Sequence, residues 1–213
     1  MAEGIREAAS VIAACDGRDG LEILVLERST RSRFLPGYLA FPGGASDADD
    51  AVRAERWFGT ADEAQRACGV RELLEEVGLA LTADGLAEAP DRSLASVDAS
   101  PPRADQLCEI ARWVAPPQVP VRFDARFFAV ASSRAVRPTP DGAEVAEAWW
   151  MPPGRLLEEW EEGSRKLYWP TYFTVRALAS CRGTDELLAL RIDTREPDDG
   201  EVDRLPRATF WQE

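Results

Sequence analysis

Three glutamates near the middle of the sequence have the side-chain type and the spacing that suit binding of a divalent cation. If their segment is helical, Glu72, Glu75 and Glu76 fall within about 100° of arc, because an α-helix has 3.6 residues per turn. Like charges at these spacings repel one another, and the C-terminal end of a helix disfavours anions. A bound cation would reverse both penalties. A solvated acidic face is the simpler interpretation of the glutamates alone.

The element needed to position these glutamates is an amphipathic helix. The side of the segment opposite the glutamates is apolar and consists of Val70, Leu73, Leu74 and Val77. Upstream, Thr60 and Glu63 have the spacing of a capping box, in which each side chain accepts a hydrogen bond from the other residue's backbone. We therefore expect the helix to begin near Ala61 and to end near Val77.

The segment from Arg71 to Gly78 resembles the second half of the Nudix box, the sequence pattern of the Nudix hydrolase superfamily. In that pattern a Gly is followed after five residues by a Glu, and the Arg-Glu segment follows after seven more. Glu63 has this distance to Arg71, and Gly44 is the matching glycine. Eighteen residues separate Gly44 from Glu63, so the resemblance implies a Nudix box that contains thirteen inserted residues.

The resemblance leaves two roles open. Glu63 is predicted either to cap the helix or to orient Arg71, as the corresponding glutamate of the family does. The extra segment, about residues 51–59, is interpreted first as a surface excursion, with an acyl pocket or a dimer contact as alternatives.

Upstream of the box, a basic and glycine-rich stretch suits a polyanionic ligand. Gly43 and Gly44 permit a positive φ and a close backbone approach beneath a diphosphate, although an ordinary tight turn is the alternative. The guanidinium groups of Arg28 and Arg33 can bind phosphate with two hydrogen bonds each. The stretch from Leu24 to Gly44 is similar to the signature of coenzyme A diphosphatases, a branch that carries an insertion in its box.

Taken together, the resemblance implies a metal-dependent diphosphatase. Its Mg²⁺ or Mn²⁺ would be held by Glu72 and Glu76, with Glu75 as a further ligand, and Arg71 would orient these carboxylates. Glu144 or Glu147 is the candidate general base outside the helix, and solvent-exposed acids are an equally good interpretation of both.

The implied substrate is coenzyme A or acyl-coenzyme A, which would be split into 3′,5′-ADP and a phosphopantetheine product. ADP-ribose, a dinucleotide or another nucleoside diphosphate derivative is the alternative substrate. A third hypothesis is a Nudix-fold module that senses a nucleotide without cleaving it. The retention of all three glutamates argues against a sensor.

Composition limits the remaining choices. The chain has 213 residues, a formal net charge of −13 and no histidine, so mechanisms that need a catalytic histidine are excluded. The strong negative charge disfavours a polymeric nucleic acid and leaves a small-molecule diphosphate as the expected partner, with a homodimer left open. No stretch resembles a membrane span or a signal peptide, which predicts a cytoplasmic protein. The widely spaced cysteines (Cys15, Cys68, Cys108 and Cys181) are interpreted as reduced thiols.

The order of predicted elements indicates an α/β protein. Strands are expected over residues 8–15 and 21–28, joined by a hairpin turn, and then at 79–81, 109–114, 123–131 and up to Met151. Residues 82–106 are expected to form a loop with a short helix, and two further helices are expected over 155–162 and 170–180. By resemblance these elements form one Nudix domain over residues 1–190, an α/β/α sandwich with a mixed central sheet and a loop-helix-loop motif. Residues 191–213 are expected to form an acidic tail.

Overall fold

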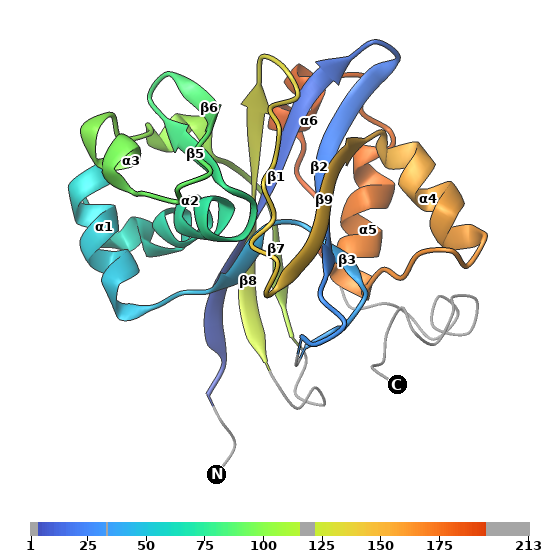
Figure 1. Ribbon diagram of the computed structural model, residues 1–213, viewed down its shortest axis with the longest axis horizontal. Helices are drawn as coiled ribbons and strands as arrows, with labels where there is room; N and C mark the ends of the chain where they lie inside the picture. Colours follow the sequence, from blue (N-terminus) through green and yellow to red (C-terminus); the bar gives the residue numbers. More distant parts are fainter. Residues whose placement is uncertain (1–3, 33, 116–121, 195–213) are drawn as a thin grey trace.

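The computed structural model describes residues 4–32, 34–115 and 122–194, which form three layers (Figure 1). A twisted sheet stands in the middle, with one group of helices on each of its faces. The predicted α/β/α sandwich around a mixed sheet is confirmed.

The central sheet is mixed because its two longest strands run parallel. These are β1 (Arg6–Gly17) and β8 (Phe123–Ser132), and their ten paired positions fix the centre of the sheet. All other pairs in this sheet are antiparallel. They involve β2 (Gly20–Arg28), β3 (Leu39–Ala40), β4 (Gly43–Ala45), β7 (Cys108–Val114) and β9 (Val145–Met151).

The sheet splits where β1 and β2 separate, and this split positions the glycine pair. β1 pairs with β2 only next to their hairpin turn, over residues 14–17 and 20–23. Farther along, β3 pairs with β2, and β4 pairs with residues 8–10 of β1. The chain between β3 and β4 therefore crosses from one strand to the other and carries Gly43 and Gly44 into the split.

One helical layer surrounds the segment that carries the three glutamates. It contains α1 (Ala48–Phe58), a 3₁₀ turn η1 (Ala61–Glu63), α2 (Ala64–Val77) and α3 (Ala95–Ala99). A separate two-stranded sheet, β5 (Leu79–Thr82) with β6 (Gly85–Glu88), follows α2, and a second 3₁₀ turn, η2 (Ala104–Gln106), precedes β7. The other layer consists of α4 (Pro153–Glu161), α5 (Trp169–Leu178) and α6 (Thr184–Ala189).

Alternation along β1 shows how the sheet separates two hydrophobic cores. Ala9, Val11 and Ala13 belong to the core beneath α2, whereas Ile12 and Ala14 belong to the core beneath α4, α5 and α6. This follows from the period of two in a strand, which points successive side chains to opposite faces.

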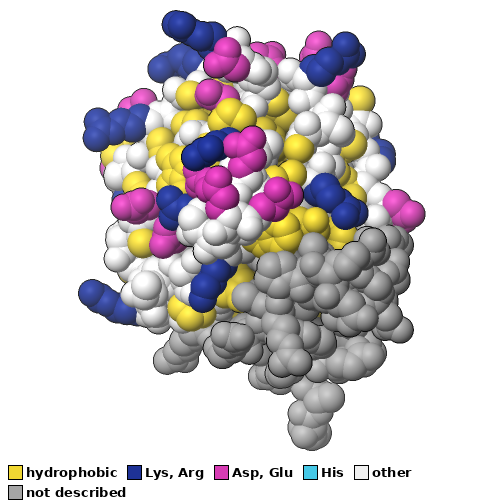
Figure 2. All heavy atoms as spheres, turned by 90° about the vertical axis from the view of Figure 1, so that its right-hand side faces the viewer, with side chains coloured by type: hydrophobic (Ala, Val, Ile, Leu, Met, Phe, Trp, Pro, Cys, Tyr) yellow, Lys and Arg dark blue, Asp and Glu magenta, His cyan; other side chains and the backbone are white. Residues whose placement is uncertain are grey.

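The outer face of α4 is polar. Arg155 pairs with two glutamates on the same helix. Figure 2, which views the molecule from the side of this helix, shows charged side chains of both signs close together.

The predicted capping box is only half formed: Thr60 is an N-cap as predicted, but of the 3₁₀ turn η1, and the return contact of Glu63 is missing. The Thr60 side chain accepts a hydrogen bond from the backbone N–H of Asp62 at 3.3 Å, and the carboxylate of Glu63 pairs with Arg66 instead of returning to Thr60. Residues 61–63 therefore form a 3₁₀ turn, and α2 begins at Ala64.

The interpretation of residues 51–59 as a surface excursion is wrong, because residues 51–58 are part of α1. Ala54 is fully buried and Trp57 is nearly so, both in the same core as α2. The Trp57 indole donates a hydrogen bond to Asp98 at 2.8 Å, which links α1 to α3.

Most other predicted elements are present, but several short ones were not predicted, among them β3 and β4 beside the glycine pair. The prediction missed β6 within the expected loop, and it missed α6 after the second C-terminal helix. Residues 191–194 have no regular structure, and the rest of the predicted tail lies outside the described residues. The four cysteines are free thiols, of which Cys15 and Cys68 are buried. Within the described ranges, no helix is long and apolar enough to cross a membrane.

Candidate active site

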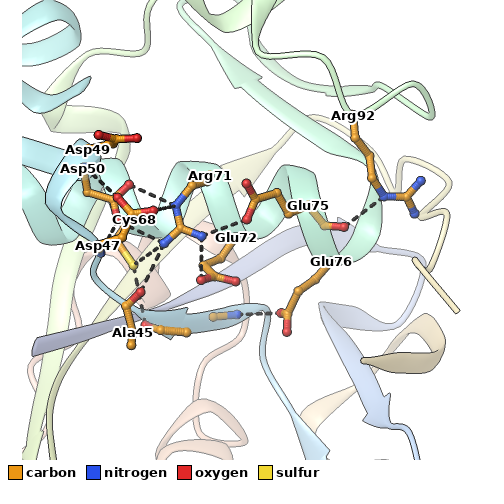
Figure 3. A network of polar contacts seen from close by, with 12 residues as sticks. Ala45, Asp47, Asp49, Asp50, Cys68, Arg71, Glu72, Glu75, Glu76 and Arg92 are labelled. Atoms are coloured by element: carbon orange, nitrogen blue, oxygen red, sulfur yellow. Dashed lines mark hydrogen bonds and ion pairs between the residues drawn. The ribbon is translucent and has the colours of Figure 1, made fainter. Parts of the chain in front are cut away.

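The last two turns of α2 carry the three predicted glutamates at very different depths (Figure 3). Glu76 is buried, with 4% of its surface exposed, Glu72 is half-buried and Glu75 is exposed. The four apolar residues predicted for the opposite side are all fully buried: Val70, Leu73, Leu74 and Val77. The amphipathic interpretation of this helix is confirmed, and it explains why the carboxylates face the split in the sheet.

Burial raises the pKa values of the inner two carboxylates, Glu72 and Glu76. Burial, followed by the charge of Glu72, raises the pKa of Glu76 to about 8, although a hydrogen bond from the Gly43 backbone and the charge of Arg28 oppose the rise. The pKa of Glu72 is also raised, chiefly by burial, with Arg71 opposing. Two close, desolvated carboxylates favour either a proton or a cation between them.

The glycine pair contacts these carboxylates directly. The Gly43 N–H donates to Glu76 Oε2 at 2.8 Å, and a Cβ on Gly44 would clash with the carboxylate of Glu72. A Cβ on Gly43 would clash with the backbone carbonyl of Ala9 in the neighbouring strand. The expected positive φ is not present at either glycine. Both positions need glycine for close approach, Gly43 to strand β1 and Gly44 to the carboxylate of Glu72.

Arg71 is the centre of the polar network in Figure 3. Its Nη1 donates to Glu72 Oε1 and to Glu75 Oε2, both at 2.8 Å. Its other side donates to Asp50, from Nε to Oδ1 and from Nη2 to Oδ2, both at 3.0 Å. Arg71 is 6% exposed and Asp50 is fully buried. The guanidinium therefore holds two of the three glutamates in place, as the resemblance implied.

Asp50 is the site residue that the sequence prediction missed. Glu63, predicted to cap α2 or to orient Arg71, does neither, because its carboxylate contacts Arg66. Five residues separate Gly44 from Asp50, which is the spacing that the Nudix pattern gives between its glycine and its first glutamate. That spacing was visible in the sequence, provided that an aspartate was accepted in place of the glutamate.

Glu144 lies in the turn that precedes β9 and is exposed. Its charge contributes to the raised pKa values of Glu72 and Glu76, so its carboxylate lies near both. Glu147, the alternative candidate base, is part of β9 itself and is paired in register with Glu27 of β2. Glu144 is therefore the candidate base whose charge acts on both inner glutamates.

Of the two predicted phosphate-binding arginines, only Arg28 can be placed, because Arg33 lies outside the described residues. The Arg28 side chain donates to the Phe34 carbonyl at 2.9 Å and to Ser32 Oγ at 3.0 Å. It thus supports the loop after β2, and its positive charge also reaches Glu76.

A cavity of about 590 Å³ lies elsewhere, between β7 and residues 191–194. Its lining contains three arginines, but each has partners within the protein. Arg66 contacts Glu63 and the Leu107 carbonyl, Arg112 binds both carboxylate oxygens of Asp124, and Arg191 donates to the carbonyls of Leu188 and Leu190. Two of these three guanidinium groups, those of Arg66 and Arg112, are therefore already paired with a carboxylate.

The donor set on α2 fits a hard divalent cation. In the part of the chain that the structure describes, no three acidic or thiol side chains are already gathered for metal binding. The cause is visible in the contacts: Arg71 holds Glu72 and Glu75 on one side, while Gly43 holds Glu76 on the other. Carboxylate oxygens are the ligands that Mg²⁺ prefers, and a cation would offset both the burial and the charge of Glu72 that raise the pKa of Glu76.

An α/β/α sandwich in which one helix holds carboxylates against a pair of strand glycines is the arrangement that the Nudix resemblance implies. The NUDIX domain family model matches residues 4–169, and the chain belongs to this family. The curated relative "Putative nudix hydrolase 7" of Caenorhabditis elegans is 27% identical over 194 residues. That alignment covers 84% of this chain and 62% of the relative, so the chain spans less than two thirds of the relative's length.

Two solved structures illustrate the fold. A NUDIX hydrolase from Alicyclobacillus acidocaldarius matches with a TM-score of 0.79 and 30% identity, covering 91% of this chain and 100% of its own. An Ap4A hydrolase from C. elegans matches with a TM-score of 0.50 and 12% identity, covering 81% of this chain and 93% of its own, which shows the fold alone. The Nudix resemblance seen in the sequence is thus confirmed for family and fold.

Proposed function

We propose that this protein is a metal-dependent hydrolase that cleaves the diphosphate linkage of a nucleoside diphosphate derivative. The observation that carries the proposal is the pair of desolvated carboxylates, Glu72 and Glu76, held against the Gly43–Gly44 backbone. Such a pair is costly unless a cation is bound, and it lies where a backbone loop can approach a phosphate. Membership of the NUDIX family supports the same reaction class.

The roles of the residues follow from their positions. Glu72 and Glu76, with Glu75 as the outer ligand, would hold Mg²⁺ or Mn²⁺, which supplies charge neutralisation for the diphosphate. Arg71 keeps Glu72 and Glu75 oriented. Glu144 is proposed to accept the proton of the water that attacks phosphorus, as the diphosphate P–O bond breaks and the leaving phosphate carries away the bridging oxygen.

Coenzyme A or acyl-coenzyme A is the proposed substrate, with 3′,5′-ADP and (acyl-)phosphopantetheine as products. The similarity of residues 24–44 to the coenzyme A diphosphatase signature supports this choice, and the position of Arg28 near Glu76 is consistent with it. ADP-ribose or another nucleoside diphosphate derivative is the alternative substrate. A non-catalytic nucleotide sensor is the third candidate.

The test is a phosphate-release assay coupled to a phosphatase, with coenzyme A, ADP-ribose and a dinucleotide as substrates and Mg²⁺ or Mn²⁺ as the metal. Rapid cleavage of ADP-ribose without any cleavage of coenzyme A would overturn the proposed substrate. Tight binding without product under either metal would favour the sensor. Glu76→Gln is expected to lower kcat at least about 100-fold, whereas Glu161→Gln on the exposed end of α4 is the matched control.

The extra segment of the Nudix box is proposed to begin after Asp50. Twenty residues separate Asp50 from Arg71, where the family pattern has seven, so thirteen residues are again in excess. They fall in α1 and in the turn that follows it. We also propose that residues 1–190 form one catalytic domain.

A further inference from the structure

The turn that carries Glu144 is fastened to the end of α2 by backbone hydrogen bonds. The last carbonyls of a helix have no partner within the helix. Here the Thr139 N–H donates to the Val77 carbonyl at 2.7 Å, and the Asp141 N–H donates to the Glu76 carbonyl at 3.0 Å. The segment after β8 is therefore hydrogen-bonded, where its turn begins, to the backbone of Glu76, the proposed metal ligand.

The Asp141 side chain then folds the turn. Its Oδ1 accepts from the backbone N–H groups of Ala143, Glu144 and Val145 at 3.2, 3.1 and 2.8 Å. Its Oδ2 accepts only from Glu144, at 3.1 Å. Gly142 has a φ of 74° and donates from its N–H to the Val145 carbonyl at 3.1 Å, which closes the turn.

The far end of the turn is attached to the strand that leads to Arg28. The Ser29 N–H donates to the Glu144 carbonyl at 2.8 Å. Glu144 is therefore held between the end of α2 and the end of β2. A second tie runs from Arg92, whose Nε donates to the Glu75 carbonyl at 2.9 Å and whose Nη2 donates to the Thr139 carbonyl at 2.6 Å. Figure 3 shows Arg92 reaching this end of α2.

We infer that Asp141 is a positioning residue, which fixes the Glu144 carboxylate relative to Glu76 before metal and substrate bind. The inference rests on the proposed function, because it assigns to Glu144 the proton transfer described above. A general base must lie within hydrogen-bond reach of its proton, and a misplacement of about 1 Å can cost about 100-fold in rate. The Asp141 carboxylate accepts hydrogen bonds from three backbone N–H groups of this exposed turn. Without it, the turn would no longer hold Glu144 in one fixed position.

The two variants Asp141→Ala and Asp141→Asn separate the hydrogen bonds from the charge. Alanine removes all acceptors, so we expect kcat to fall about 10- to 100-fold while KM stays within about threefold. Asparagine keeps the Oδ1 acceptor that binds all three N–H groups, so it should recover most of this loss despite its missing charge.

The matched control is Asp16→Ala. Asp16 also binds a backbone N–H and a side chain, those of Thr184 at 2.8 and 3.0 Å, but it caps α6 on the other face of the sheet. This change should lower stability without lowering kcat. Hydrogen exchange supplies a readout independent of activity, because Asp141→Ala should speed exchange of the amides of residues 143–145 and Asp16→Ala should not.

An active wild type whose Asp141→Ala variant keeps the wild-type kcat would overturn this inference alone. Equal loss of kcat in Asp141→Ala and Asp16→Ala would also overturn it, because the effect would then be one of stability. A wild type that hydrolyses no diphosphate with either metal would overturn the proposed function, and the inference with it.

Discussion

The buried pair between Asp50 and Arg71 permits a quantitative test with Asp50→Asn. The substitution keeps the size of the side chain, removes its charge and turns one acceptor oxygen into a donor. An amide NH₂ in place of Oδ2 would face the donors of Asp47 N–H and Arg71 Nη2, and one in place of Oδ1 would face those of Arg71 Nε and Arg53 Nη1. Asp50 is fully buried, so water cannot replace the lost bonds.

The expected loss of stability is large compared with that of a neighbouring control. Removing one partner of a buried ion pair costs about 3–5 kcal/mol, and the lost capping interaction at the start of α1 adds about 1 kcal/mol. In Asp49→Asn the same chemical change affects a carboxylate that is 79% exposed and 3.8 Å from Arg53. Such a surface pair contributes about 0–1 kcal/mol. Urea unfolding of the wild type and both variants at pH 7 measures the difference.

The pH dependence of this difference gives a second check. Burial opposes ionisation of Asp50, but the hydrogen bonds from Arg71 outweigh it, and the pKa of Asp50 is lowered from 3.8. A lowered pKa contributes stability that is complete above the unfolded value and is lost as the pH falls through the folded value. The advantage of the wild type over Asp50→Asn should therefore be constant at neutral pH and shrink below pH 3.8. Equal unfolding midpoints for the two variants at pH 7 would refute the reasoning.

Three further substitutions test the site. Gly44→Ala places a methyl group on the carboxylate of Glu72 and must displace it, so we expect kcat to fall about tenfold or more. An unchanged kcat would contradict the contact. Burial raises the pKa of Glu76 from 4.5 to about 8, so the metal-free wild type should lose stability as the pH rises between these values. Glu76→Gln should lose less stability over this range, because only the raised pKa of Glu72 still contributes, and parallel stability curves for the two proteins would count against the assignment. Glu63→Ala removes a contact with Arg66 only, so steady-state assays should find kcat within about twofold of the wild type; a 100-fold loss would restore Glu63 to the site.

The sequence predicted the local part of the site well. The glutamates and the apolar residues behind them follow from helical periodicity within α2, which requires no knowledge of the rest of the fold. The hairpin of β1 and β2 was also predicted, because its two apolar strands and the turn between them are adjacent in the sequence. Short elements were missed: β6 has four residues and pairs only with β5, and α6 has six residues. Their patterns are too brief to distinguish them from loop.

The contacts that join distant segments could not be predicted in this way. Glu63 was the predicted partner of Arg71, and packing selects Asp50 instead. Glu63 lies in a 3₁₀ turn, one helical turn before Arg66, so its carboxylate binds that nearer arginine. Asp50 is twenty-one positions from Arg71 and reaches it because α1 packs along α2.

An aspartate at position 50, where the Nudix pattern has a glutamate, makes the orientation of Arg71 depend on the extra segment, residues 51–59. An aspartate side chain is one methylene shorter than that of glutamate, so its carboxylate reaches Arg71 only if the backbone that carries it lies close to α2. α1 provides this approach, since Ala54 and Trp57 are buried in the same core as α2. Residues 51–59 would then be required to orient Arg71, even though its hydrogen bonds and ion pairs are with other residues. Without Asp50, the remaining carboxylates within Arg71's reach include Glu72, which is a proposed metal ligand, so arginine and metal would compete for it.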